Sequence, residues 1–404
     1  MSDGASGGDE VAAAAPAWGA VYALTLCVAT LIASEFMPVS LLTPIAAGLH
    51  LTDGQAGQAI SASGLFAVLT SLFISAATRR VDRRTLLLGL TVLMLVSGVV
   101  VACAPSFLVL ICGRALVGIV IGGFWSMSAA TMMRLVPARD VPRGLAILNG
   151  GNALATTIAA PLGSFLGQSI GWRGAFLSVV PLAAITLFWL FLTLPAMPNR
   201  ARPDALAAFR VLRRPLVPLG MAAAALFFCG QFALFTYLRP FLELVTRVDV
   251  ATLSLLLLLL GAAGLAGTVL IGRFLPLRLH GALILMPLLM AALAAGLAAF
   301  GSSLALTAVL LALWGLIGTA APVGWWLWLS TALPDEAEAG GGLMVAVVQL
   351  AITAGAAFGG VLVDRFGYRV DFTASAVVLC GCAGAAFLIG RGGRPAAVER
   401  RARA

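Results

Sequence analysis

Long apolar runs fill most of this sequence and alternate with short breaks that are polar or rich in Gly and Pro. A helix that spans a bilayer needs about 20 mostly apolar residues. The runs that meet this length are 18–46, 57–77, 85–104, 107–133, 144–168, 174–194, 217–238, 251–273, 281–299, 303–331, 341–363 and 371–390. The first run is too long for a secretory signal and lacks its positive flank and cleavage site, so we expect it to be retained. The pattern predicts an all-α integral membrane protein with twelve transmembrane helices.

These spans divide into two sets of six. A short repeat supports the division, because residues 162–167 and the triplet 171–173 correspond to 358–363 and 367–369 at a constant offset of 196 residues (358 minus 162). Two copies of a six-helix unit are typical of secondary transporters, whose substrate site lies between the halves near the bilayer midplane. The predicted parts are a cytoplasmic tail (1–17), two halves (18–194 and 216–390), a cytoplasmic linker (195–215) and a basic cytoplasmic tail (391–404).

Composition excludes several classes of protein. Of the 404 residues, 61% are hydrophobic and 10% are charged, whereas a soluble domain is about 45–50% apolar and about 25% charged. All 25 basic residues are Arg, so the chain has no lysine for a phosphate-binding loop or a Schiff base. His50, His280 and the six Cys show no spacing that suits a metal. We therefore expect no catalytic residues, metal or cofactor, and no enzyme activity.

The arginines also predict the orientation. With a cytoplasmic N-terminus, nineteen arginines fall in inner loops and tails, five fall in outer loops, and Arg114 lies inside a span. This bias places both termini in the cytoplasm. The high isoelectric point of about 10.2 then reflects membrane topology and contact with anionic lipid, and we expect no nucleic-acid partner.

Two charges interrupt the spans of the first half, Glu35 in the first and Arg114 in the fourth. A charge at the centre of a membrane helix costs about 2.5–3.5 kcal/mol, so it normally has a function. A carboxyl group removed from water favours its protonated form, as a carrier's proton site requires. The alternative is that the two residues merely pair and hold helices together. Gly118 and Gly122 continue from Arg114 at helical spacing and would allow a close approach of another helix.

Five further side chains are candidates for binding a flat, polar ligand. They are the amides and the indole of Asn149, Asn152, Gln231, Gln349 and Trp314. Amides can form hydrogen bonds with a polar ligand, and an aromatic ring can stack on a flat one. Hydrogen bonds between helices are the structural alternative for the amides. Trp314 lies deeper in its run than the Trp residues that anchor helix ends at the membrane interface.

Several motifs resemble the major facilitator superfamily, and more narrowly its twelve-helix drug/proton antiporter branch. They are the stretch 35–44, the loop residues Asp82, Arg83 and Arg84, the helix motif from Gly113 through Gly118 and Gly122 to Trp125, and Pro161 and Gly163 followed by Gly171, Trp172 and Arg173. The loop departs from the family pattern, with Ser75 and Arg79 where Gly and Asp are usual.

The resemblance implies efflux driven by proton entry, with alternating access as the two halves rock. It gives Glu35 and Arg114 a role in proton coupling, and gives the loop, the two glycines and Pro161 with Gly163 roles in the conformational change. The stretches 161–167, 230–240 and 322–325 resemble exporters of purine ribonucleosides such as inosine or guanosine. We expect a monomer in the bacterial inner membrane whose partners are substrate, protons and lipid, with a link to drug resistance. A broad drug or sugar exporter, or a non-transporting membrane receptor, remains an alternative.

Overall fold

The computed structural model describes residues 17–78, 81–198, 210–333 and 337–392. Most of the two predicted tails, the central part of the predicted linker, and Arg79 lie outside the described residues. Within the described part of the chain, every regular element is a helix. The first bundle holds α1 (Trp18–Leu49), α2 (Asp53–Ala77), α3 (Arg83–Ala102), α4 (Phe107–Leu135), η1 (Ala138–Asp140) and α5 (Val141–Thr193). The second holds α7 (Val217–Thr236), α8 (Leu238–Phe241), η2 (Leu242–Thr246), α9 (Val250–Phe300), α10 (Leu304–Gly318), α11 (Ala321–Ala332), α12 (Ala337–Phe366) and α13 (Tyr368–Gly392).

The helices confirm an all-α membrane protein. In the described residues, eleven helical segments are long and apolar enough to cross a membrane. One of them, Arg143–Thr193, has 51 residues and would be about 76 Å long if straight, against a hydrocarbon core of about 30 Å. A non-helical residue, Gly171, divides it into two crossings, as Arg278 divides α9. Since the segment of 51 residues crosses twice, the eleven segments give the twelve crossings that the sequence predicts.

The two turns of the sequence repeat have the same backbone conformation. Gly171 has a φ of 74° and Gly367 a φ of 84°, a region that is open to Gly because it lacks a Cβ. The next residues, Trp172 and Tyr368, begin the sixth and twelfth crossings. The short repeat therefore marks the same reversal of direction in each bundle.

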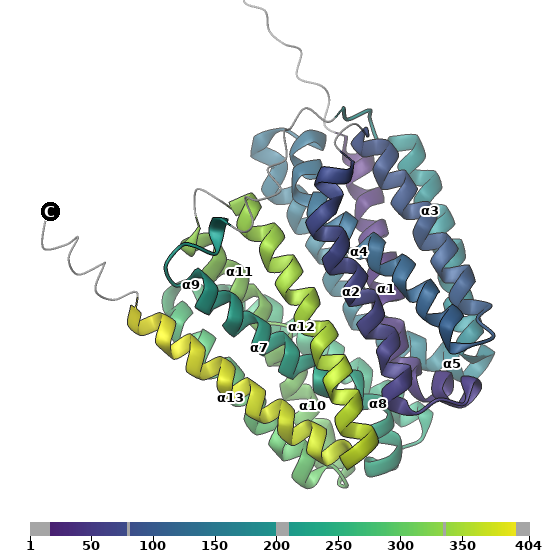
Figure 1. The fold of residues 1–404 in the computed structure, drawn as a ribbon, viewed down its shortest axis with the longest axis vertical. Helices are drawn as coiled ribbons and strands as arrows, with labels where there is room; N and C mark the ends of the chain where they lie inside the picture. The colour runs from purple at the N-terminus through teal and green to yellow at the C-terminus, as the bar shows by residue number, and fades with distance from the viewer. Residues whose placement is uncertain (1–16, 79–80, 199–209, 334–336, 393–404) are drawn as a thin grey trace, which may run out of the picture.

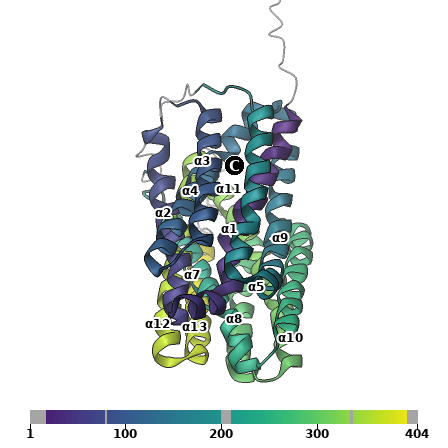
Figure 2. The ribbon, with the colours of Figure 1, turned by 90° about the vertical axis from the view of Figure 1, so that its right-hand side faces the viewer.

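The two bundles lie side by side, the first in purple to blue and the second in green to yellow (Figure 1). The long helices run roughly alongside one another in the view from the side (Figure 2). Each bundle has its own buried core, around Leu24 and Phe124 in the first and around Phe227 and Trp325 in the second. Large apolar side chains such as Leu108 remain exposed. Such exposed apolar surface suits contact with lipid tails.

Small residues let helices within the first bundle approach closely. A Cβ at Gly118 would overlap the Ser63 carbonyl of α2, and one at Gly122 would overlap the Ala67 carbonyl. A Cβ at Gly163 of α5 would overlap the Ser40 hydroxyl of α1. The glycines singled out in the sequence therefore lie at close contacts between helices.

The hydrogen bonds between the bundles lie on one side of the molecule. Within the described residues, they join positions 35–61 and 157–164 of the first bundle to positions 239–261 and 349–368 of the second. On this side Asp364 of α12 accepts from the Thr52 hydroxyl at 2.7 Å and from the Gly54 amide at 3.0 Å. We call the end of the molecule around Thr52 and Asp364 the sealed side. The bundles converge there and diverge toward the end where α1 begins (Figure 1).

Candidate functional site

Glu35 lies at the boundary between the bundles, about midway along α1. Its side chain is buried, with 9% of the residue exposed. The side-chain amide of Gln349, on α12 of the other bundle, donates to Glu35 Oε1 at 3.4 Å. The structure therefore brings together two of the sequence candidates, one from each half.

Arg114 contacts the backbone of α1 and not the carboxylate of Glu35. It is 1% exposed and donates to the carbonyls of Ser34 at 2.7 Å, Glu35 at 3.1 Å and Ala59 at 3.2 Å. It also donates to the Ser63 hydroxyl at 3.0 Å. These bonds join α4 to α1 and α2, and they leave the Glu35 carboxylate facing Gln349.

The prolines of α1 explain why its carbonyls are available to arginines. Proline has no N–H, so it frees the carbonyl four residues earlier in a helix. Pro38 therefore frees the Ser34 carbonyl that Arg114 binds. Pro44 frees the Ser40 carbonyl, which accepts from Arg239 of the second bundle. Each proline of α1 thus provides a free backbone carbonyl to which a buried arginine can donate.

Arg239 is a site residue that the sequence prediction missed, since it counted this arginine in an outer loop. It is 4% exposed and donates to Glu243 at 2.8 Å, four residues along the chain. Burial lowers the pKa of Arg239, and the neighbouring Glu243 carboxylate opposes that shift. The spacing of Arg239 and Glu243 was a signal for this pair.

The other amide candidates differ in their surroundings. Asn149 is exposed and donates to the Leu145 carbonyl of its own helix at 2.9 Å. Asn152 is half-buried. Gln231 donates to the Gly318 carbonyl at 3.3 Å, while its buried Oε1 has no hydrogen-bond partner. Gln231 is thus the amide candidate whose side-chain oxygen could accept a hydrogen bond from a ligand.

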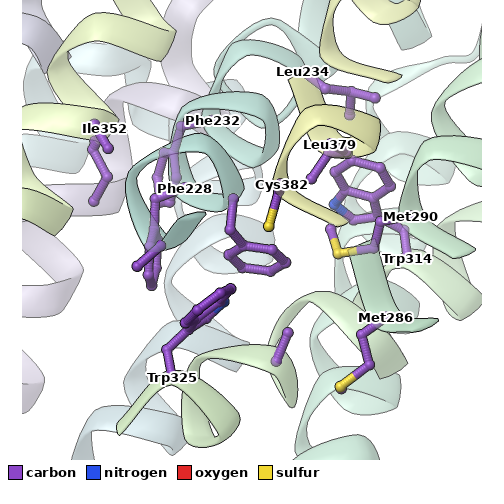
Figure 3. Packing of buried hydrophobic residues seen from close by; sticks show 14 of the residues in the cluster. Phe228, Phe232, Leu234, Met286, Met290, Trp314, Trp325, Ile352, Leu379 and Cys382 are labelled. Atoms are coloured by element: carbon purple, nitrogen blue, oxygen red, sulfur yellow. The ribbon is translucent and has the colours of Figure 1, made fainter. Parts of the chain in front are cut away.

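Trp314 lies inside the core of the second bundle. It is 1% exposed, and its indole packs with Met290 and Leu379 close by (Figure 3). A ligand could stack on this ring only after the core had separated. The structure thus gives Trp314 the surroundings of a packing residue, and stacking on it stays a prediction.

An aromatic group that the sequence prediction did not single out lies beside Glu35. Phe36 of α1 stacks on Phe232 of α7, with ring centroids 6.0 Å apart and planes at 26°. Phe235 completes the group, with its ring edge-on to both. Phe36 and Phe235 are each only half-buried. These rings offer an aromatic surface between the bundles, next to the Glu35 and Gln349 pair.

The loop residues between the second and third crossings hold the first bundle together. Asp82 caps α3 by accepting from the Arg84 amide at 2.7 Å, and it also accepts from the Met197 amide at 2.8 Å. Arg84 donates to the Phe191 carbonyl at 2.8 Å. Arg83 bonds the same segment through its own amide, which donates to the Met197 carbonyl at 3.1 Å. These contacts tie the start of α3 to the end of α5.

Pro161 and Gly163 lie where α5 meets its neighbours. Pro161 frees the Thr157 carbonyl, against which Gly261 of the second bundle packs so closely that a Cβ would lie 2.6 Å from it. The Thr157 hydroxyl also donates to the Gly261 carbonyl at 3.2 Å. Gly163 faces α1. The part of α5 that carries this motif therefore contacts both bundles.

Comparison with known families decides what kind of protein this is. The sequence model of the Major Facilitator Superfamily matches residues 24–351. The chain belongs to this superfamily. It is therefore a multi-pass membrane transporter and not an enzyme. In the described residues, no group of three or more His, Cys, Asp or Glu side chains could hold a metal ion.

Two curated relatives cover nearly the whole chain. It is 57% identical over 383 residues to the transcription regulatory protein OpdE of Pseudomonas aeruginosa strain PAO1, covering 94% of this chain and 95% of the relative. It is 43% identical over 373 residues to the purine ribonucleoside efflux pump NepI of Salmonella enteritidis PT4, covering 91% of this chain and 92% of the relative. The first relative is named as a regulatory protein and the second as an efflux pump.

Solved structures support the fold. A bacterial homologue of the human lysosomal transporter Spinster, in an inward-facing and unoccupied conformation, superposes with a TM-score of 0.79 at 18% identity, covering 94% of this chain and 98% of that one. The human organic anion transporter MFSD10 superposes with a TM-score of 0.68 at 19% identity, covering 92% of this chain and 99% of that one. At these identities the likeness establishes the fold alone.

Proposed function

We propose that this chain exports purine ribonucleosides, such as inosine and guanosine, in exchange for protons. The observation that carries the proposal is the Glu35 carboxylate at the boundary between the bundles, with Gln349 opposite and Arg114 bound to backbone carbonyls. A carboxyl group at this place can bind a proton on one side of the membrane and release it on the other. The identity of 43% to NepI supports the substrate.

Proton coupling supplies enough energy for concentrative export. One proton that enters at 100 mV supplies about 2.3 kcal/mol, which supports a gradient of about fifty-fold. Arg114 assists by fixing α1, because it bonds the backbone carbonyls of Ser34 and Glu35. The chain needs no cofactor for this cycle and acts as a monomer.

The proposed substrate site is the region between the bundles beside Glu35. The rings of Phe36 and Phe235 can stack on a purine, while Gln231 and Gln349 can bind its edge. Asn149 and Asn152 lie on α5 toward the end opposite the sealed side. There they can form hydrogen bonds with the ribose hydroxyls. Trp314 packs in the core of the second bundle, and stacking of a purine on its indole stays a prediction.

We infer from the arginine bias that both termini are cytoplasmic and that the protein lies in the bacterial inner membrane. The sealed side then faces outward, and the structure is open to the cytoplasm. In this state a cytoplasmic nucleoside could enter, while the seal prevents its escape. The two halves, residues 18–194 and 216–390, act as the rocking units.

The relative OpdE favours a second candidate function, an effect on gene expression. An exporter can produce such an effect by lowering the cytoplasmic concentration of a small molecule that a separate regulator senses. A variant that cannot concentrate its substrate separates this route from a direct one. If Glu35→Gln changes expression of the affected genes as a deletion does, regulation depends on transport.

The direct test reconstitutes the purified protein in vesicles that contain a pH-sensitive dye. We expect inosine and guanosine to produce proton movement, and uridine, free ribose and unrelated antibiotics to produce much less. Equal responses to all compounds would favour a broad drug or sugar exporter. Saturable binding with no movement of protons or nucleoside would contradict transport and favour a receptor.

A further inference from the structure

A second buried carboxyl group lies on the sealed side, away from Glu35. Asp371 lies in the first turn of α13 and is 0% exposed. Neither of its carboxylate oxygens has a hydrogen-bond partner. The other carboxyl groups of this side are bonded, since Asp53 accepts from the Tyr368 hydroxyl at 2.6 Å and Asp364 accepts from two groups of α2. Asp371 is thus the carboxyl group of this region without a donor.

Asp371 is enclosed by α7, α12 and α13. A Cβ on Gly359 of α12 would lie 3.0 Å from Asp371 Oδ1 and 3.0 Å from the ring of Tyr237. The next residue, Phe372, packs on Phe241 with ring centroids 4.4 Å apart. One turn further, the Ser375 hydroxyl donates to the Gly230 carbonyl at 2.6 Å. Asp371 therefore lies in a closely packed layer.

The cations and hydroxyls near this layer are engaged elsewhere or lie apart from it. Tyr237 donates its hydroxyl to the Ala356 carbonyl at 2.7 Å. Arg239 binds Glu243 and the Ser40 carbonyl. On α9, His280 lies beside Gly390, at the other end of α13. Among the described side chains, the remaining titratable or charged groups on the adjoining elements are Asp53, Cys229, Arg278, Asp364, Arg365, Tyr368, Arg369, Cys380, Cys382 and Arg391.

Tyr237 connects Asp371 to the contact between the bundles. A Cβ on Gly57 of α2 would overlap the Tyr237 hydroxyl, and one on Gly360 of α12 would lie 2.5 Å from it. The tyrosine is therefore held between α2 and α12, with its ring next to Asp371. Movement of α2 away from α12 would break this contact and would give water a route to Asp371.

We propose that Asp371 is a second proton-binding site, which must hold a proton before the bundles can close on the sealed side. An ionised carboxylate that is buried without donors is strongly disfavoured, whereas a neutral carboxylic acid is tolerated. The dipole at the start of α13 favours the ionised form, but it does not replace the missing hydrogen bonds. Closure therefore selects the protonated form.

The proton at Asp371 returns to the side from which it came. When the sealed side is open, water on that side delivers a proton to the carboxylate, and the next opening allows that proton to leave to the same water. No net proton crosses the membrane at this site, which distinguishes it from Glu35. The inference rests on the proposed function only for the statement that the bundles alternate between two states.

Protonation of the other two carboxylates of the sealed side would have the opposite effect on closure. Asp53 and Asp364 act as hydrogen-bond acceptors for α13 and α2, so their protonation at low pH would weaken closure. Protonation of Asp371 instead permits closure. If low pH favours the closed state, Asp371 controls closure. If high pH favours it, Asp53 and Asp364 control closure.

The test measures distances between spin labels in lipid nanodiscs, with no nucleoside present. One label is attached to the exposed native Cys103, which follows α3, and one to Arg365→Cys, which is exposed near the end of α12, with the other cysteines replaced by Ala. We expect a short distance at low pH. The ratio of long to short distances should rise about tenfold per pH unit once Asp371 ionises. Asp371→Asn should keep the short distance at all pH values.

The matched control is Ser375→Ala, which removes another buried polar group of α13 and should leave the pH response intact. If Asp371→Asn does not fold, Asp371→Leu carries the same expectation, because neither side chain ionises. A normal pH response in the variant would overturn the proposal. So would a closed state that is favoured by base. Failure of nucleoside transport would contradict the proposed function without affecting these distances.

Discussion

The side-chain amide of Gln349 on α12 donates to the carboxylate of Glu35 on α1, at 3.4 Å across the boundary between the two bundles. Arg114, which a pairing role would place on that carboxylate, instead bonds three backbone carbonyls and a hydroxyl. Each of the two charges inside the first bundle therefore has a separate task. Arg114 bonds α4 to α1 and α2, while the Glu35 carboxylate faces the other half, where we propose that it exchanges a proton.

Loss of the Arg114 guanidinium should destabilise the first bundle. Arg114→Gln removes several charge-assisted hydrogen bonds at a buried site, and we expect a loss of about 2–4 kcal/mol in the free energy of unfolding. The matched control is Arg134→Gln, since exposed Arg134 donates to the Pro198 carbonyl and should cost less than about 1 kcal/mol. Thermal unfolding in detergent measures both. Equal melting temperatures for the two variants would contradict this role.

The contact between α2 and α4 should not tolerate a methyl group. Gly122→Ala would force the Ala67 carbonyl away, and overpacking of this kind costs about 1–3 kcal/mol. Gly89→Ala is the control, because a Cβ on Gly89 of α3 meets nothing within 4 Å. It should be neutral or slightly stabilising, since Ala favours a helix by about 1 kcal/mol over Gly. The yield of monodisperse protein after heating measures the difference, and the reverse order would refute the packing argument.

Asp364 should control how often the sealed side opens. Asp364→Ala removes the bonds from the Thr52 hydroxyl and the Gly54 amide, each worth about 1.5–3 kcal/mol when charged. We expect hydrogen exchange across residues 52–64 to accelerate about tenfold or more. Asp140→Ala, at the opposite end of the first bundle, should leave that exchange unchanged. Protection that persists without Asp364 would mean that other contacts maintain the seal.

Gln231 and Trp314 should affect different quantities. Gln231→Ala removes a buried acceptor that has no partner, and loss of one such bond to a nucleoside should raise KM about five- to thirtyfold. Trp314→Phe should change KM little and lower the free energy of unfolding by about 1–3 kcal/mol, because the indole fills the core. Concentration-dependent inosine flux and thermal unfolding separate the two effects. A raised KM for Trp314→Phe alone would restore the indole as a stacking surface.

The sequence predicted what depends on hydropathy and left open what depends on packing. Lengths of apolar runs give the twelve crossings, and isolated charges inside them reveal Glu35 and Arg114. The rotation of each helix is not encoded in that signal, so Trp314 could not be assigned to a core and the ring of Phe36 could not be placed beside Glu35. Asp371 went unnoticed because it lies at the very start of an apolar run, where a charge usually reaches water.

The burial of Arg239, which follows an apolar run, could not be predicted from the sequence either. Its position after an apolar run predicts exposure, yet the short helix α8 turns it back toward α1. The proline that frees its acceptor, Pro44, is visible in the sequence. The partner of that carbonyl is 199 residues away, and only the fold brings the two together.

The most direct measurement of the central claim is uphill movement of inosine in sealed vesicles under an imposed pH gradient. The wild-type protein should concentrate inosine against its gradient while the pH difference lasts. Glu35→Gln should retain exchange of labelled for unlabelled inosine but lose all uphill movement, and Asp249→Asn, at the exposed cap of α9, should behave as wild type. Uphill transport that is unchanged in Glu35→Gln, or a wild-type flux that ignores the pH gradient, would contradict the account.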